Sequence, residues 1–176
     1  MYKKSHIVYW ISVGLVMSFI ISLIGSFLPS QSVTQTILFK IDALFAISAF
    51  ACLGSKASSE KMEIPAAGFT VLAIAQGLFL AEIDNPGHWD YQSANTAVLF
   101  MVPAVIMIYY YTVFPNWLRI VGIISVIPFI ILFIIRLTVG FENTSFYENI
   151  VYLIYQLITL CWAWQIWVEE KIKDEQ

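Results

Sequence analysis

The sequence has few charged residues. Asp, Glu, Lys and Arg together make up 12% of its 176 residues, whereas a soluble domain carries roughly 25%. Hydrophobic residues make up 60%, and the mean hydropathy is +0.79. A water-soluble domain of this size buries only part of its surface, so it could not hide that much apolar area. The scarcity of charge therefore argues against a soluble protein and predicts a chain surrounded by lipid.

Cysteine and histidine are also scarce. Cys52 and Cys161 both lie in apolar stretches, so we expect packing roles, with no disulfide framework and no metal site. His6 and His88 fall on opposite sides of the predicted membrane and cannot jointly bind haem or zinc. The sequence contains no HExxH, P-loop, GxSxG or dinucleotide-binding motif, and no basic run that would indicate nucleic acid. We therefore expect no cofactor and no nucleic-acid partner, and the sequence assigns no catalytic residue.

Six apolar runs are each close to the roughly 20 residues that a transmembrane helix needs. Residues 1–176 thus form one all-α domain, a polytopic integral membrane protein with a six-helix transmembrane bundle. The first run is too long for the apolar core of a signal peptide, so we expect it to be retained. Pro103 and Pro128 lie inside predicted helices and favour kinks there. The predicted helices are Ile7–Leu28, Ile37–Leu53, Ile64–Ala81, Ala97–Phe114, Leu118–Val139 and Ile150–Val168.

The distribution of positive charge predicts the orientation, because cytoplasmic loops carry an excess of Lys and Arg. Seven such residues fall on one side and two, Lys40 and Arg136, on the other. Both termini are therefore predicted to be cytoplasmic, in a multi-pass protein of the cell membrane. Aromatic residues near the predicted helix ends are interpreted as interfacial belts. The inner belt comprises Tyr9, Trp10, Tyr109, Tyr110, Tyr111, Trp117, Trp164 and Trp167, and the outer belt Trp89, Tyr91, Tyr147 and Tyr152.

Polar and ionisable side chains within the apolar runs are the candidate site, because such groups are costly in lipid and are often functional. They fall mainly in the outer half of the predicted bundle. Asp42 is expected to pair with Arg136, either as a structural ion pair or as part of a ligand site. The loop from Glu82 to Tyr91 could cap that site, although a plain solvated loop is the alternative. The predicted ligand-binding residues are Asp42, Gln76, Glu82, Trp89, Asn95, Arg136 and Gln156.

Small residues recur every four positions along the first predicted helix. Such a face lets a second helix approach closely, either within the chain or from a membrane partner or second copy. In size and helix number the chain resembles the membrane-embedded substrate-binding subunits of energy-coupling vitamin transporters. That resemblance implies a solute-binding subunit that docks a partner through its first helix. The residues of this small-residue face are Gly14, Ser18, Ser22 and Ser26.

These observations favour a small integral membrane protein that binds a small-molecule ligand, or helps to transport it, through an outward-facing polar pocket. The surrounding lipid bilayer is its first partner. One alternative is a membrane-embedded enzyme acting on a lipid or quinone, for which the candidate groups are few. The other is a sensor or assembly subunit without chemistry, which would need a separate partner because the predicted loops are short.

Overall fold

The structure is a computed structural model that describes residues 3–29, 31–83, 91–110, 113–139 and 145–174, and these are almost entirely helical. No strand occurs in those ranges, which confirms the predicted all-α class. The helices are α1 (Lys3–Ser26), α2 (Val33–Ser59), α3 (Glu63–Glu82), α4 (Tyr91–Tyr110), α5 (Asn116–Ile124), α6 (Val126–Val139) and α7 (Ser145–Asp174).

Five helical stretches are long and apolar enough to cross a membrane. They lie in α1, α2, α3, the consecutive pair α5 and α6, and α7, while α4 contributes a shorter apolar helix, Asn95–Tyr110. Large apolar side chains also cover the outside of the bundle; on α6, Ile134 is 52% exposed and Leu137 66% exposed. An exposed apolar surface of this extent is unfavourable in water and ordinary in hydrocarbon. The chain is therefore a membrane-embedded helical protein.

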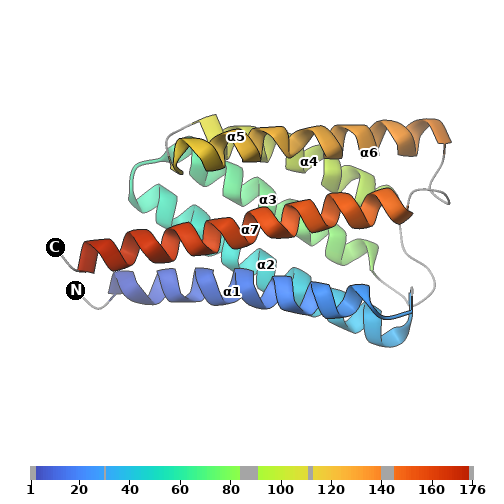
Figure 1. The fold of residues 1–176 in the computed structure, drawn as a ribbon, viewed down its shortest axis with the longest axis horizontal. Helices are drawn as coiled ribbons and strands as arrows, with labels where there is room; N and C mark the ends of the chain where they lie inside the picture. The colour runs from blue at the N-terminus through green and yellow to red at the C-terminus, as the bar shows by residue number, and fades with distance from the viewer. Residues whose placement is uncertain (1–2, 30, 84–90, 111–112, 140–144, 175–176) are drawn as a thin grey trace.

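The helices form a bundle in which neighbours in sequence are also neighbours in space. α1 packs on α2, α2 on α3, and α3 on α4, while α7 returns to pack along α1. In the view of Figure 1, α7 lies in front with α1 below it, and α5 and α6 follow one another along the upper side. The two ends of the chain lie at the same end of the bundle. α7 thus lines the interior opposite α2 and α3 and can present side chains to both.

The span predicted as one helix from Leu118 to Val139 consists of two helices, which meet at Ser125. α5 ends at Ile124, four residues before Pro128. A proline has no N–H for the carbonyl four residues earlier, and its ring collides with that carbonyl. At the junction of the two helices, the Ser125 hydroxyl donates to the carbonyl oxygen of Gly122 at 2.5 Å. Pro103, in contrast, lies inside α4 without dividing it.

Several helix ends differ from their predicted positions. α2 begins at Val33, where Ser32 is its N-cap and accepts a hydrogen bond from the backbone N–H of Gln35. α4 ends at Tyr110 rather than Phe114, and Phe114, the residue before Pro115, is biased away from helix. The Arg119 side chain donates to the carbonyl oxygens of Tyr109 and Tyr110 at 3.1 and 3.4 Å. These bonds give hydrogen-bond donors to carbonyl groups in the last turn of α4, which have no donor within the helix.

A cluster of aromatic side chains fills the centre of the bundle. Trp162 of α7 stacks on Phe114 with ring centroids 5.7 Å apart and meets Phe69 edge-on at 5.7 Å. Its indole N–H donates to the Tyr109 hydroxyl at 2.6 Å. The prediction that Tyr109 belongs to an interfacial belt is wrong, because this side chain is fully buried. We call this set the aromatic cluster: Phe50, Phe69, Tyr109, Phe114 and Trp162.

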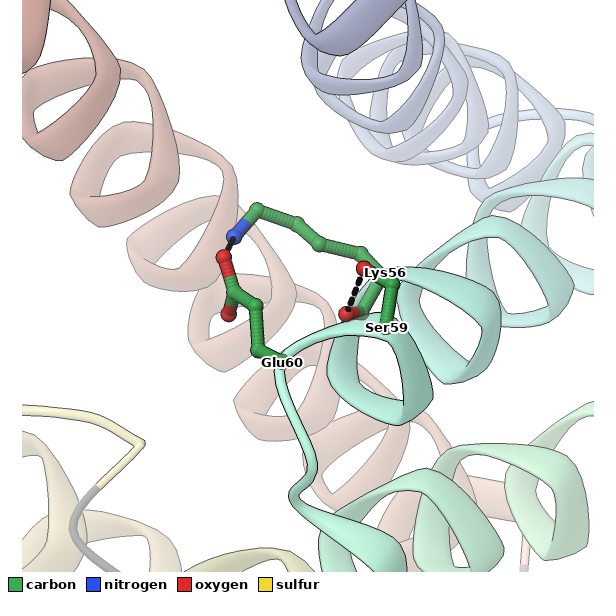
Figure 2. Close-up of polar contacts among 3 residues, drawn as sticks. All are labelled: Lys56, Ser59 and Glu60. Atoms are coloured by element: carbon green, nitrogen blue, oxygen red, sulfur yellow. Dashed lines mark hydrogen bonds and ion pairs between the residues drawn. The ribbon is translucent and has the colours of Figure 1, made fainter.

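The connection between α2 and α3 contains a residue in the left-handed backbone region. Lys61 has φ 60°, and its N–H and that of Met62 donate to the carbonyls of Ser58 and Ala57. This is the pattern of a Schellman C-cap, in which glycine is the usual residue. Figure 2 shows the adjoining ion pair between Lys56 and Glu60, 2.5 Å long, whose exposed position limits its contribution to stability.

Replacing Lys61 with glycine is expected to stabilise the protein by about 1 kcal/mol, because a left-handed conformation costs a side chain about that much. The measurement is thermal unfolding of the purified protein in detergent. Ser55→Gly is the control, since Ser55 is exposed in the interior of α2 and glycine there should lower stability. A loss of stability in Lys61→Gly as large as in the control would contradict this account of the turn.

Candidate functional site

Asp42 lies at the centre of a buried polar network between three helices. Its side chain is 2% exposed and accepts one hydrogen bond from the Ser18 hydroxyl of α1 and one from the Tyr152 hydroxyl of α7. The two donors engage different carboxylate oxygens. The side chain of Gln156, one turn beyond Tyr152 on α7, also contacts Asp42. We call these four residues the Asp42 centre.

The partners of Asp42 are all neutral. None of the described Lys, Arg or His side chains forms an ion pair with its carboxylate. A buried carboxylate without a positive partner is costly, and three hydrogen-bonding neighbours offset only part of that cost. The Asp42 centre is therefore a buried acidic site in which the described residues offer no balancing positive charge.

A small cavity adjoins the Asp42 centre between α1 and α7. Its volume is about 30 Å³, more than the roughly 10–15 Å³ that a cavity needs to hold one water molecule. Tyr152 and Gln156 contribute to its wall and also contact Asp42, so they connect the cavity to the carboxylate. Ser22 of α1 lines it and is only 3% exposed. The cavity accepts a single small group, well below the 300–1,000 Å³ of typical small-molecule pockets.

The predicted pairing of Asp42 with Arg136 is not formed. Arg136 is buried in α6 and donates to the side-chain oxygen of Asn95 on α4 at 3.2 Å. α6 packs on α4 and α7 and makes no substantial contact with α2, where Asp42 lies. The two charged residues thus belong to different parts of the bundle.

Gln76 belongs to a third set of polar contacts. Its side-chain amide, on α3, donates to the Tyr155 hydroxyl of α7 at 3.2 Å. The rings of Tyr155 and Tyr152 lie 6.4 Å apart, so this contact adjoins the Asp42 centre without being part of it. Among the predicted ligand-binding residues, the structure therefore brings together Asp42 with Gln156 and Asn95 with Arg136, and it places Gln76 beside the first pair.

Two further predicted site residues cannot be placed. Trp89 and the side chain of Glu82, the last residue of α3, lie outside the described residues. Of the loop proposed to cap the pocket, residues 82–91, the structure describes Ile83 and the backbone of Glu82 and Tyr91, and the rest lies outside the described residues.

Sequence reasoning missed the hydroxyl groups that bind Asp42. Tyr152 was assigned to the outer aromatic belt, yet its hydroxyl points inward to the carboxylate. A signal was present on α7, where Tyr152, Tyr155, Gln156 and Thr159 recur at spacings of three and four residues. That spacing places all four on one helix face. A polar stripe on an otherwise apolar helix indicates an interior face rather than an interfacial belt.

The small-residue face of α1 packs largely within the chain. A side-chain carbon on Gly14 would lie 3.0 Å from the β-carbon of Ala49 on α2, which shows how closely the two helices approach. Ser18 and Ser22 are each 3% exposed, turned toward Asp42 and the cavity. Ser26 is exposed at the end of α1 and donates to the carbonyl of Ser22. Its hydroxyl and that of Ser22 form a polar edge to the cavity.

No family model, curated protein or solved structure matches the chain. The fold defines the class of protein, a helical membrane protein with several apolar spans. The resemblance to the vitamin-transporter subunits remains one of size and predicted helix number.

Proposed function

We propose that this protein is a six-span component of the cell membrane, with both termini cytoplasmic, that binds a small cation and helps to move it across the bilayer. The six spans count α5 and α6 as one crossing and include the shorter α4. An even number of crossings returns the chain to the side on which it began, and the two chain ends do lie at the same end of the bundle (Figure 1). The excess of Lys and Arg at that end supports the orientation.

One observation carries the proposal: Asp42 is a buried carboxylate with neutral partners. A charge in a membrane interior is retained against a substantial free-energy cost, and a bound cation would offset that cost. The adjoining cavity of about 30 Å³ limits the cation to a small one, such as a hydrated proton, Na⁺ or K⁺. With the termini cytoplasmic, Asp42 lies in the outer half of the bundle.

Substitution of Asp42 tests the proposal. Purified protein is reconstituted into liposomes that contain fluorescent indicators for H⁺, Na⁺ or K⁺, and a gradient of each ion is imposed in turn. We expect flux of at least one of these ions above that of empty liposomes. Asp42→Asn should lower that flux by about tenfold or more, because losing 1.4 kcal/mol of binding free energy already gives a factor of ten.

Glu60→Gln is the matched control, since it makes the same carboxylate-to-amide change at the exposed ion pair of Figure 2. Its flux should equal that of the unmodified protein. Equal flux in Asp42→Asn, or no flux of any of these ions in the unmodified protein, would refute the proposed function.

A further inference from the structure

We infer that the cation of the Asp42 centre is an alkali metal ion, Na⁺ or K⁺, held by oxygen atoms, rather than a proton on the carboxylate. This inference rests on the proposed function, because it names the cation for the same site. Three observations support it. Hydroxyl groups already donate to both oxygens of the Asp42 carboxylate, the side-chain oxygen of Gln156 is an acceptor that receives no hydrogen bond from the described residues, and several oxygen atoms gather at the site.

Both oxygens of the Asp42 carboxylate already accept hydrogen bonds, one from Ser18 and one from Tyr152. An ionised carboxylate only accepts, whereas a protonated one must donate through one of its oxygens. Hydrogen bonds donated to a carboxylate stabilise its ionised form. The arrangement is therefore suited to a carboxylate that keeps its negative charge, and a separate cation is needed to balance that charge.

Gln156 supplies an acceptor without a donor. It is 3% exposed, and among the described residues its side-chain oxygen Oε1 has no hydrogen-bond partner. An unsatisfied buried acceptor costs about 1–3 kcal/mol, and coordination of a cation would offset that cost. Because Gln156 contacts Asp42 and also lines the cavity, its amide oxygen lies where it can share a ligand with the carboxylate.

The site offers the ligand type that hard cations prefer. The carboxylate of Asp42, the amide oxygen of Gln156 and the hydroxyls of Ser18, Ser22 and Tyr152 are all oxygen donors. A hydroxyl that donates its hydrogen to the carboxylate keeps lone pairs for a metal ion. Calcium sites usually combine several carboxylates, whereas this centre has one. A single negative charge matches a single positive charge, which selects a monovalent ion.

The test is thermal unfolding of the full-length protein in detergent as NaCl or KCl replaces choline chloride at constant ionic strength and fixed pH. Choline is too large for a cavity of about 30 Å³. We expect the Tm to rise by about 3–6 °C when the metal ion reaches ten times its Kd. Asp42→Asn should abolish this rise, and Gln156→Met should raise the Kd by about tenfold, which corresponds to about 1.4 kcal/mol of binding free energy.

Ser22→Ala provides a second variant if Gln156→Met does not fold, and it should also raise the Kd. Ser125→Ala is its matched control, because Ser125 is a buried serine at the junction of α5 and α6. That control should respond to Na⁺ or K⁺ like the unmodified protein.

The outcomes separate this inference from the proposed function. A Tm that is insensitive to Na⁺ and K⁺, combined with an Asp42-dependent proton flux in liposomes, would overturn the assignment of the cation as a metal ion. The proposed function would still stand. A metal-dependent Tm that survives in Asp42→Asn would overturn the assigned site. A Tm that rises with Na⁺ or K⁺ only when Asp42 is present, without flux in liposomes, would support the ion site and refute transport.

Discussion

Replacing Gly122 with alanine is expected to destabilise the protein by about 3 kcal/mol, at the upper end of the usual cost of overpacking. A β-carbon at this position of α5 would lie 1.9 Å from two ring carbons of Tyr109. The ring has little freedom to move away, because Tyr109 is fully buried and its hydroxyl accepts a hydrogen bond from Trp162. Gly122 is thus a position of close approach between α5 and the aromatic cluster. Thermal unfolding in detergent measures the effect.

Gly77→Ala is the matched control, since a β-carbon on Gly77 would have no neighbour within 4 Å. Within α3, alanine should raise stability by up to about 1 kcal/mol through its higher helix propensity. Combining Gly122→Ala with Tyr109→Leu should cost less than the sum of the two single changes, because the smaller side chain relieves the collision. Equal stability of Gly122→Ala and Gly77→Ala would show that α5 does not pack on Tyr109 in this way.

Trp162→Ala is expected to cost about 3–5 kcal/mol, the range for large aromatic residues removed from a core. The indole is fully buried and contacts every other member of the aromatic cluster. Its removal would leave a cavity and would also leave the Tyr109 hydroxyl without its donor. In a membrane, packing of this kind contributes much of the free energy that holds helices together. The measurement is the free energy of unfolding in mixed micelles.

Trp164→Ala is the control for this prediction. Trp164 lies two residues further along α7 and is 69% exposed, so its loss removes little packing and should change stability by less than about 1 kcal/mol. A similar loss in both variants would mean that Trp162 does not occupy the centre of the bundle.

The Asp42 centre shows how far sequence reasoning reaches at a membrane site. Asp42 and Gln156 could be selected because each interrupts an apolar run, and such interruptions are visible in the chain itself. Their partners could not be chosen in the same way. The expected partner of Asp42, Arg136, lies on a helix that does not adjoin α2, whereas Ser18 and Tyr152 do reach it. Serine and tyrosine attract little notice in an apolar run because they are tolerated at many positions there.

Helix rotation explains the error at Tyr109. Its position near the end of an apolar run indicates only how far along the helix the residue lies, since the rise per residue is constant. Burial depends on the direction in which the side chain points around the helix axis, and that direction is fixed by the neighbours. Tyr109 points at Gly122 and Trp162, while Tyr110 on the next residue is 70% exposed.

The sequence by itself determined the helical class, the lipid surroundings and the approximate extent of the apolar spans. These follow from local hydropathy and from the need to satisfy every backbone hydrogen bond within the membrane. Only the tertiary structure decided which polar groups meet, where the cavity lies and where the span near Ser125 divides. Those features depend on how helices far apart in the sequence rotate and pack against one another, and no local pattern of residues fixes that arrangement.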